Sequence, residues 1–297
     1  MERRDFLKNA SVRLAGVGGT VVAGSRLWSA QEVKKEAGAA PKPRRLFVKP
    51  KDYRKEPFQR LVILGESTVE GGPWLHAKED RYADVLVGLI NAVQDKPIEY
   101  INKGISNNSI SPRSPGYGQS AKPSAIERYK TDVIAYNPDL FILAYGLNDM
   151  RAAMPLKDFR EDMATIIREV KKACNPVTVL TTVYYMTGYG SWPPINKGSI
   201  ELTLKYNECI RSLAAEFGCI LADAWSSEGG ADWLIHYDGV HAHKVGNLVL
   251  GHRVFEAIAQ HCSGLTNYVY AQERNTEWTR MVTQKRAEAG NPFKKTW

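Results

Sequence analysis

The sequence predicts an α/β fold, a three-layer α/β/α sandwich around a mostly parallel, five-stranded sheet. Short apolar runs of the length typical of buried strands recur near residues 61–65, 98–102, 139–145, 177–183 and 219–223. Amphipathic segments of helical length separate or follow them, near residues 81–94, 123–136, 156–173, 198–217 and 246–261. Strands that alternate with helices form a parallel sheet whose two faces are covered by the helices.

Several elements carry local signals of where they begin or end. The first strand, Leu61 to Leu64, is apolar throughout and stops at Gly65, as buried parallel strands do. Asp80 stands where the N-cap of the next helix is expected, and Pro155 stands where the helix near 156–173 can start. That helix presents a core face of apolar side chains at helical spacing, Phe159, Met163, Ile166, Ile167 and Val170.

The formal net charge of +8 at pH 7 is spread unevenly along the 297 residues. Residues 59–262 carry twenty Lys or Arg and twenty-three Asp or Glu, a net charge of −3. The segments 1–30, 31–58 and 263–297 carry +3, +5 and +3. A nucleic-acid surface would place basic charge on the folded body, so this distribution disfavours nucleic acid as a partner.

The first 30 residues have the features of an export signal. Residues 2–8 read ERRDFLK, which resembles a twin-arginine motif, and the apolar run Leu14 to Gly24 follows. This run has 11 residues, against the ~20 that a membrane span needs. We therefore expect cleavage after Ala23 or Ala30, the twin-arginine export machinery as a partner, and a periplasmic or extracellular protein with no stable membrane span.

The chain divides into four segments. Residues 1–30 form the export signal, and residues 31–58 form an exposed basic linker rich in Pro and Ala. Residues 59–262 form one large domain, which 43% hydrophobic residues can supply with a core. Residues 263–297 form a helical extension. Its helix near 268–288 is expected to pack on the domain through its larger apolar side chains, Tyr268, Tyr270, Trp278, Met281 and Val282.

The four cysteines, Cys174, Cys209, Cys219 and Cys262, match no zinc-binding spacing. Cys174 and Cys219 each precede an expected strand, so neighbouring strands would bring them near one another. A disulfide in an oxidising compartment and buried free thiols both fit the pattern.

A hydroxyl stands two residues past the end of the first strand. The stretch LVILGESTVEGG covers residues 61–72 and places Ser67 in a Gly-rich turn. In an open α/β sheet, ligands bind in the crevice beyond the carboxyl ends of the strands, where a base from another loop can reach such a hydroxyl. A serine in this position is also an ordinary turn or cap residue, so the stretch alone leaves both interpretations open.

Two further clusters follow the carboxyl ends of strands. The third strand ends in Gly146-Leu147-Asn148-Asp149, where the Asn148 amide is either a turn former or a donor to a developing oxyanion. Residues 236–243 read HYDGVHAH and precede the last helix. Asp238 and His241, three residues apart on one turn, can hydrogen-bond, which fixes the imidazole tautomer and favours its protonated form. A doubly wound sheet brings these loops and Ser67 to one crevice.

Together these blocks resemble the SGNH hydrolase family, also called GDSL esterases. Gly65-Glu66-Ser67 is similar to the family's first block, Gly146 to Asp149 to its third, and Asp238 to His241 to its last. The resemblance covers roughly residues 60–262, identifies this segment as an SGNH hydrolase domain and implies a flavodoxin-like fold.

The resemblance also implies roles for these residues. Ser67 would be the nucleophile, His241 the general base and Asp238 its orienting acid. The backbone N–H of Ser67, the Asn148 side chain and one further amide would form the oxyanion hole. The implied reaction is ester hydrolysis through an acyl-enzyme, with no cofactor and no metal.

Two residues depart from the family's usual pattern. Glu66 stands where the family usually has Asp, in a side chain expected to brace the loop rather than react. The second block usually supplies a Gly N–H to the oxyanion hole, and the matching position here is Asn107. We expect the Asn107 N–H to serve, because Asn tolerates a left-handed backbone. The alternative donor is the N–H of Gly104.

Other interpretations of the same residues stay open. His236, His241 and His243 with Asp238 could ligate zinc, as in a metal-dependent hydrolase. A catalytically silent binding module on the same fold is the second alternative.

The loops at the expected crevice are rich in aromatic residues. Four of these are candidate substrate-binding residues, Trp74, Tyr185, Trp192 and Trp233. With the export signal, they favour a small-molecule or polysaccharide ester as the substrate, most of all an acetylated carbohydrate. A lipase or esterase for lipid or short-chain acyl esters is the alternative.

Overall fold

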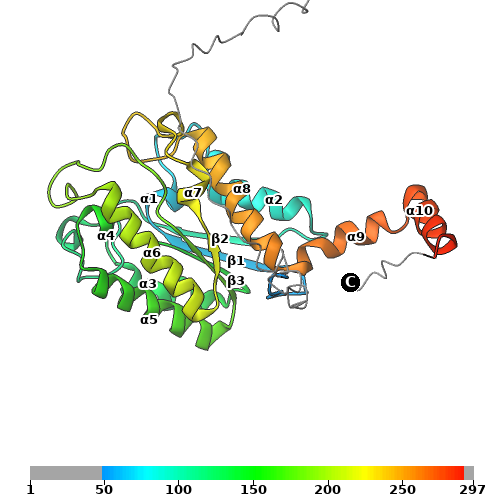
Figure 1. Ribbon diagram of the computed structural model, residues 1–297. Coiled ribbons are helices and arrows are strands. Elements are labelled where there is room, and N and C mark those ends of the chain that lie inside the picture. The colour runs from blue at the N-terminus through cyan, green and yellow to red at the C-terminus, as the bar shows by residue number, and fades with distance from the viewer. Residues whose placement is uncertain (1–48, 291–297) are drawn as a thin grey trace, which may run out of the picture. The chain divides into compact units, whose positions relative to one another are not determined.

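The computed structural model describes residues 49–290, so the expected export signal lies outside the described residues. Its sheet has five strands, β1 (Arg60–Gly65), β2 (Glu99–Gly104), β3 (Leu140–Ala144), β4 (Val177–Thr181) and β5 (Ile220–Ala222). They lie in the order β2-β1-β3-β4-β5, and every neighbouring pair is parallel (Figure 1). The predicted parallel, five-stranded sheet is confirmed.

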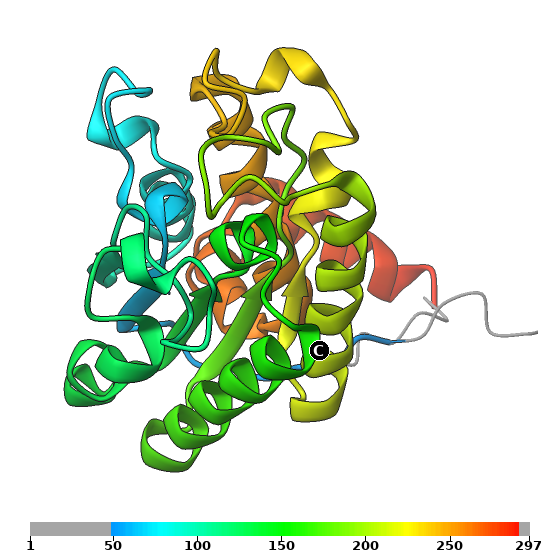
Figure 2. The same cartoon turned by 90° about the vertical axis from the view of Figure 1, so that its left-hand side faces the viewer.

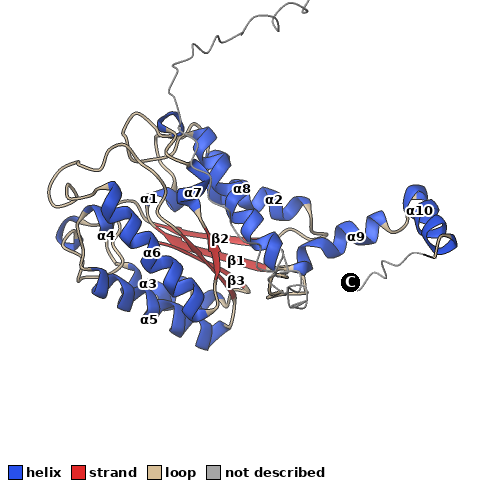
Figure 3. Ribbon diagram, viewed as in Figure 1, coloured by secondary structure: helices blue, strands red, loops and turns tan. Residues whose placement is uncertain are grey.

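Helices connect the strands and continue the chain after β5. They are α1 (Ser67–Glu70), α2 (Tyr82–Ala92), α3 (Ala125–Asp132), α4 (Leu147–Arg151), α5 (Leu156–Cys174), α6 (Ile200–Phe217), α7 (Ala224–Glu228), α8 (Lys244–His261), α9 (Asn267–Glu273) and α10 (Glu277–Glu288). Short 3₁₀ turns lie at Lys78–Asp80, Tyr117–Gln119, Ile134–Tyr136, Asp232–Leu234 and Ser263–Thr266. Helices α2 and α8 pack together on one face of the sheet, and α3, α5 and α6 cover the other (Figures 2 and 3). The result is the expected α/β/α sandwich.

The core lies between these layers. Strand β1 is fully buried from Leu61 to Leu64, and β3 is buried along its whole length, as their continuous apolar runs predict. The predicted face of α5, Phe159 to Val170, is likewise buried.

The strand order places the switch in winding direction at β1. Strand β1 pairs with β2 on one side and with β3 on the other, so the connections that leave β1 and β3 run over opposite faces of the sheet. The crevice at such a switch point lies beyond the carboxyl ends of the strands. Ser67 follows β1 and Asn148 follows β3, so both lie at this edge.

Helix α2 begins differently from the sequence expectation. Asp80 is not the N-cap of α2; it belongs to a 3₁₀ turn, and its carboxylate pairs with the Lys244 ammonium at 2.9 Å. The N-cap is Arg81, and the amide of Tyr82 donates instead to the Asn247 side chain on α8 at 2.9 Å. A partner on a distant helix therefore takes the place of a local cap.

The segment before β1 contacts the domain from residue 51 onward, where the Lys51 carbonyl oxygen lies 3.0 Å from Nδ1 of His261. The Asp52 carboxylate accepts hydrogen bonds from Ser263, and Arg54 pairs with Asp139 at 2.8 Å. The Phe58 side chain is buried in the core. These contacts group residues 51–58 with the domain rather than with an exposed arm.

Helices α9 and α10 form the described part of the C-terminal segment. Trp278 is 69% exposed, so it does not pack on the domain as its aromatic character led us to expect. Figure 1 shows α10 apart from the sheet.

Between residues 49 and 290, no helix has the length and hydrophobicity that a membrane crossing requires. All four cysteines lie in the described part of the chain and are free thiols.

Candidate active site

Ser67 is the first residue of α1, directly after β1, and its side chain is almost fully enclosed. Its Oγ lies 2.9 Å from Nε2 of His241, which reaches it from a loop 174 residues further along the chain. The two residues expected to work together are therefore in hydrogen-bond contact.

The imidazole of His241 is held from its other side by Asp238. His241 Nδ1 lies 2.7 Å from Oδ2 of Asp238. The second carboxylate oxygen of Asp238 accepts the backbone N–H groups of Val240 and His241 at 2.8 and 2.9 Å. Because both carboxylate oxygens are used, Asp238 cannot rotate without losing these bonds. Nδ1 therefore carries the proton, and Nε2 is free to accept one from Ser67.

Burial and hydrogen bonding have opposite effects on the pKa of Asp238 and on that of His241. For Asp238, partial burial works against ionisation, but the hydrogen bonds from His241 and Val240 outweigh it and lower its pKa. For His241, burial is the largest effect and lowers the pKa, while Asp238 opposes it. An ionised Asp238 beside a neutral His241 is the combination from which proton transfer to the imidazole can start.

Trp74 lies on the face of His241. The two ring centroids are 3.6 Å apart, and the planes differ by 7°. Of the four aromatic residues expected to bind substrate, Trp74 is thus the one in contact with the Ser67–His241 pair, and its ring face is used by the imidazole.

Asn148 lies in the first turn of α4, after β3. Its side-chain amide donates to the carbonyl of Asn108 at 3.0 Å, which fixes the side chain beside the loop that follows β2. An amide nitrogen has two hydrogens, so the second remains available for another acceptor.

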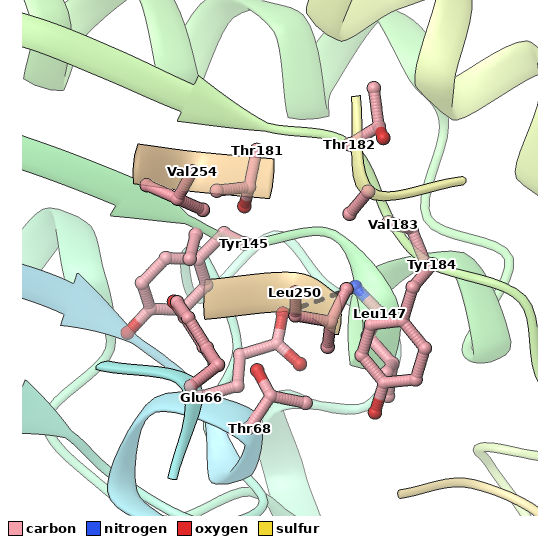
Figure 4. A pocket seen from close by; sticks show the side chains of 13 residues that line it. Glu66, Thr68, Tyr145, Leu147, Thr181, Thr182, Val183, Tyr184, Leu250 and Val254 are labelled. Atoms are coloured by element: carbon pink, nitrogen blue, oxygen red, sulfur yellow. Dashed lines mark hydrogen bonds between the residues drawn. The ribbon is translucent and has the colours of Figure 1, made fainter. Parts of the chain in front are cut away.

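The carboxylate of Glu66 connects the β1 and β3 loops. It accepts the backbone N–H groups of Gly146, Leu147 and Asn148 at 2.8, 3.1 and 3.1 Å (Figure 4 marks the bond from Leu147). These are the otherwise unpaired amides at the N-terminus of α4. Burial raises the pKa of Glu66, and the nearby charge of Asp149 adds to this effect. The longer side chain in the family's Asp position therefore holds the Asn148 loop against the Ser67 loop, a bracing contact of the kind expected from the sequence.

Arg128 on α3 is a buried support that the sequence analysis missed. It donates to the carbonyls of Gly65 and Lys103 and to the hydroxyl of Tyr145 at 3.1, 2.9 and 2.7 Å. The Tyr145 hydroxyl in turn donates to the Asn108 side chain at 2.6 Å. One arginine thus ties together the ends of β1, β2 and β3. Its position within an amphipathic helix gives no sign of this, because most helical arginines face solvent.

The two candidate donors in the second block differ in their surroundings. Asn107 has φ = 54°, the left-handed conformation that a Gly would adopt without strain, and its N–H has no acceptor among residues 49–290. The Gly104 N–H donates to the Asn102 side chain at 2.8 Å. A Cβ at Gly104 would lie 2.1 Å from the backbone nitrogen of Glu70, so this glycine serves a close approach of two chain segments. The geometry favours Asn107 as the available donor.

The remaining aromatic residues line neighbouring loops. The Tyr185 hydroxyl donates to Asp232 at 2.7 Å. Trp192 and Trp233 are 64% and 78% exposed, as sugar-stacking rings would be. The loop after β4 is tied to the His241 loop, because Thr187 and Gly188 both donate backbone N–H groups to the Gly239 carbonyl.

The histidines named for a zinc site have other partners. His243 is the N-cap of α8: its Nδ1 accepts the Val245 N–H at 3.0 Å, and its Nε2 lies 2.5 Å from the Trp233 carbonyl oxygen. His236 Nδ1 accepts the backbone N–H of Asp238 at 3.2 Å and lies 3.4 Å from Oδ2, the same oxygen that contacts His241. Within the described residues, no three His, Cys, Asp or Glu side chains gather in a way that could hold a metal ion.

A small cavity lies behind the Ser67 loop, on the side of α8. Figure 4 shows Glu66, Leu147 and Tyr184 around it, with Leu250 and Val254 from α8. Its volume is about 40 Å³. This holds one or two water molecules but is too small for a sugar ring or a long acyl chain.

Comparisons with known proteins agree with this geometry. The family model described as GDSL-like Lipase/Acylhydrolase matches residues 63–248. An acetylxylan esterase from Geobacillus stearothermophilus is 23% identical over 216 residues, which cover 65% of this chain and 90% of the relative.

Solved structures share the fold. The crystal structure of an acetylxylan esterase from Geobacillus stearothermophilus matches with a TM-score of 0.53 and 19% identity, over 69% of this chain and 96% of that chain. A lipase/acylhydrolase from Enterococcus faecalis matches with a TM-score of 0.55 and 20% identity, over 67% of this chain and 95% of that chain.

Proposed function

The chain belongs to the GDSL-like lipase/acylhydrolase family and is therefore a hydrolase of ester bonds, and we propose that it is an exported serine esterase that deacetylates a carbohydrate. The observation that carries the serine mechanism is the unbroken line of hydrogen bonds from Asp238 through His241 to Ser67, at 2.7 and 2.9 Å. A hydroxyl, an imidazole and a carboxylate in this order form the arrangement that activates a serine for attack on an ester.

In the proposed mechanism, the proton of Ser67 passes to Nε2 of His241 as Oγ attacks the ester carbonyl. The imidazolium then gives this proton to the departing alcohol oxygen, which leaves an acyl group on Ser67. Water attacks the acyl-enzyme with His241 as the base, which releases the acid and restores the serine. Asp238 stabilises the imidazolium in both steps.

The oxyanion formed in each step needs donors that are already in place. The backbone N–H of Ser67, the free hydrogen of the Asn148 amide and the N–H of Asn107 are the proposed donors. The Glu66 carboxylate and the Arg128 side chain hold the loops that carry these donors, so they are positioning residues in this proposal.

Two observations support an acetylated carbohydrate as the substrate. The curated relative is named an acetylxylan esterase. Exposed Trp192 and Trp233 lie on loops near the His241 loop and offer rings on which sugars can stack.

A substrate panel tests the proposed function. The chain should hydrolyse acetylated xylo-oligosaccharides and acetylated monosaccharides faster than p-nitrophenyl esters with long acyl chains, and Ser67→Ala serves as the blank. A fluorophosphonate probe should label the wild type and not Ser67→Ala. If the probe labels the wild type but long-chain esters are hydrolysed faster than acetylated sugars, the substrate is a lipid ester and not a carbohydrate. If the wild type is neither labelled nor active, the result supports a silent binding module.

The domain organisation remains part of the proposal. We place an export signal at residues 1–30, on the strength of the ERRDFLK sequence at residues 2–8, and a linker after it. The hydrolase domain extends to about residue 262, and the segment 263–297 continues it.

A further inference from the structure

Arg151 is the last residue of α4 and lies one helical turn after Asn148. Residues three apart on a helix are neighbours on the same side, so the Arg151 side chain starts next to a proposed oxyanion donor. The side chain is nearly enclosed, with 4% of its surface exposed.

The guanidinium of Arg151 has almost no hydrogen-bond partners. Nη2 donates to the hydroxyl of Ser191, and Nε is enclosed without any partner. Nη1 also donates to no atom of residues 49–290 and, unlike Nε, is not fully enclosed. A buried, unsatisfied cation costs free energy, so this arrangement needs a reason.

The other enclosed arginine shows what a purely structural role looks like. Arg128 is 2% exposed, and its Nε is likewise enclosed without a partner, but its terminal nitrogens pair with Asp132 at 2.8 Å and bond to two carbonyls and the Tyr145 hydroxyl. Arg151 forms no ion pair with an Asp or Glu in the described part of the chain. The two carboxyl groups that act electrostatically on it, Glu66 and Asp238, are already bonded to backbone amides and to His241.

The guanidinium is bonded to the loop after β4, which Thr187 and Gly188 tie to the Gly239 carbonyl in the His241 loop. Burial is the main cause of the lowered pKa of His241, and the positive charge of Arg151 adds to it. The hydroxyl that Arg151 does bind belongs to Ser191, next to Trp192, whose ring is 64% exposed. A cation without a counter-ion and an exposed aromatic ring thus meet on a loop that is bonded to the His241 loop.

We infer that Arg151 binds a carboxylate of the substrate, and that the esters this site prefers are acetylated acidic sugars of the uronate class. A guanidinium is planar, and its two terminal nitrogens, here the partly accessible Nη1 and the second hydrogen of Nη2, match the two oxygens of a carboxylate, while Trp192 can stack on the sugar ring that carries it. This inference rests on the proposed function and specifies its substrate.

The first test uses the wild-type full-length chain. Glucuronate and glucuronamide differ in whether the sugar carries a charged carboxylate or a neutral amide of nearly the same size. We expect glucuronate to inhibit hydrolysis of p-nitrophenyl acetate competitively, with an inhibition constant at least ~10-fold lower than that of glucuronamide. Equal inhibition by the two compounds, or none by either, would overturn the inference.

The second test compares kcat/KM for an acetylated methyl glucuronoside with that for the matching acetylated methyl glucoside. Arg151→Gln should lower this ratio about 10-fold or more, mostly through KM for the charged ester, and Arg151→Lys should lower it less. Arg168→Gln, an exposed position on α5, should leave the ratio at its wild-type value. An unchanged ratio in a folded Arg151→Gln would mean that Arg151 is purely structural.

The two proposals fail in different ways. A chain that the fluorophosphonate probe does not label and that hydrolyses neither ester refutes the proposed esterase. A labelled, active chain that hydrolyses both esters equally well, with no preference for glucuronate over glucuronamide, refutes only the role of Arg151. If Arg151→Gln does not fold, the wild-type inhibition experiment still decides.

Discussion

Trp74 lies flat against His241, with the ring centroids 3.6 Å apart and the planes within 7° of parallel. The stack covers one face of an imidazole whose two nitrogens are already in contact with Asp238 and Ser67. Burial is the largest cause of the lowered pKa of His241, and the Trp74 ring supplies part of that burial. Trp74 therefore helps to keep the proposed base neutral, which is the form that accepts a proton.

We expect Trp74→Ala to shift the acid limb of the pH–rate profile to higher pH. Loss of the ring exposes His241 to water, so its pKa rises toward the ordinary value of about 6.5. The variant should therefore lose more kcat/KM at pH 6 than at pH 8. Trp74→Phe keeps an aromatic ring over the imidazole and is the control. The pH profiles of kcat/KM provide the measurement, and coincident profiles for Trp74→Ala and the wild type would contradict this role.

Asp238→Asn should abolish most of the activity while the loop keeps its shape. The asparagine oxygen can still accept the amides of Val240 and His241, so its NH₂ group then faces Nδ1 of His241. Nδ1 must then accept a hydrogen bond, so the imidazole proton moves to Nε2. A protonated Nε2 cannot take the proton of Ser67. We expect kcat to fall by about 10⁴, measured with p-nitrophenyl acetate, with near-normal thermal unfolding. Activity within tenfold of wild type would refute the assignment of Asp238.

Asn148→Ala tests the proposed oxyanion donor. The side-chain amide would meet the substrate oxygen only once negative charge develops on it, so its removal should lower kcat about 10²–10³-fold with little change in KM. The variant also loses the bond to the Asn108 carbonyl, so its unfolding free energy must be measured beside its kinetics. A rise in KM with an unchanged kcat would instead assign Asn148 to ground-state binding.

The export proposal predicts where the chain is found in a bacterial cell. Replacement of both arginines, Arg3→Lys with Arg4→Lys, should leave the protein in the cytoplasm of a host that has the twin-arginine pathway, because that pathway reads the arginine pair. Cell fractionation followed by immunoblotting is the measurement, with Arg13→Lys as the matched control. Equal export of the double variant and the wild type would refute the proposal that the twin-arginine pathway exports this protein.

The fold was predictable because its signals are local. Each strand is a short apolar run, and each helix between strands repeats with helical spacing, so the alternation is visible in the sequence. The start of α2 was not predictable in this way. Asn247 on α8 accepts the Tyr82 amide, and Asp80 pairs with Lys244 instead of capping the helix. A cap that comes from a distant helix leaves no mark beside the helix it caps.

The site was predictable only in part, for the same reason. Ser67, Asn148, Asp238 and His241 lie in short motifs that the sequence shows, and the structure places His241 in direct contact with both Ser67 and Asp238. Trp74 was placed among substrate-binding rings because nothing near it in the chain shows that it stacks on His241. Arg128 and Arg151 escaped notice because their partners are decided by tertiary packing.

Glu228, the last residue of α7, holds a carboxyl group with no partner. It is 3% exposed, and neither oxygen has a hydrogen-bond partner within the described residues. Burial raises its pKa to about 8, from an ordinary value of 4.5. It lies beside Gly246 at the start of α8, next to the loop that carries His241.

A raised pKa means that the folded chain holds this proton more tightly than the unfolded chain does. The resulting stability is complete below about pH 4.5 and is lost as the pH rises through about 8. Glu228→Gln keeps the shape and cannot ionise, so we expect its unfolding free energy relative to wild type to increase from pH 5 to pH 9, by about 1–4 kcal/mol. Glu66 and Asp149 are also buried, and burial raises the pKa of each. Both residues are present in the wild type and in Glu228→Gln, so their contributions to the unfolding free energy cancel in the difference. Chemical denaturation across this pH range measures the effect, with Glu208→Gln on an exposed face of α6 as the control. Parallel curves for wild type and Glu228→Gln would show that Glu228 does not titrate in this range.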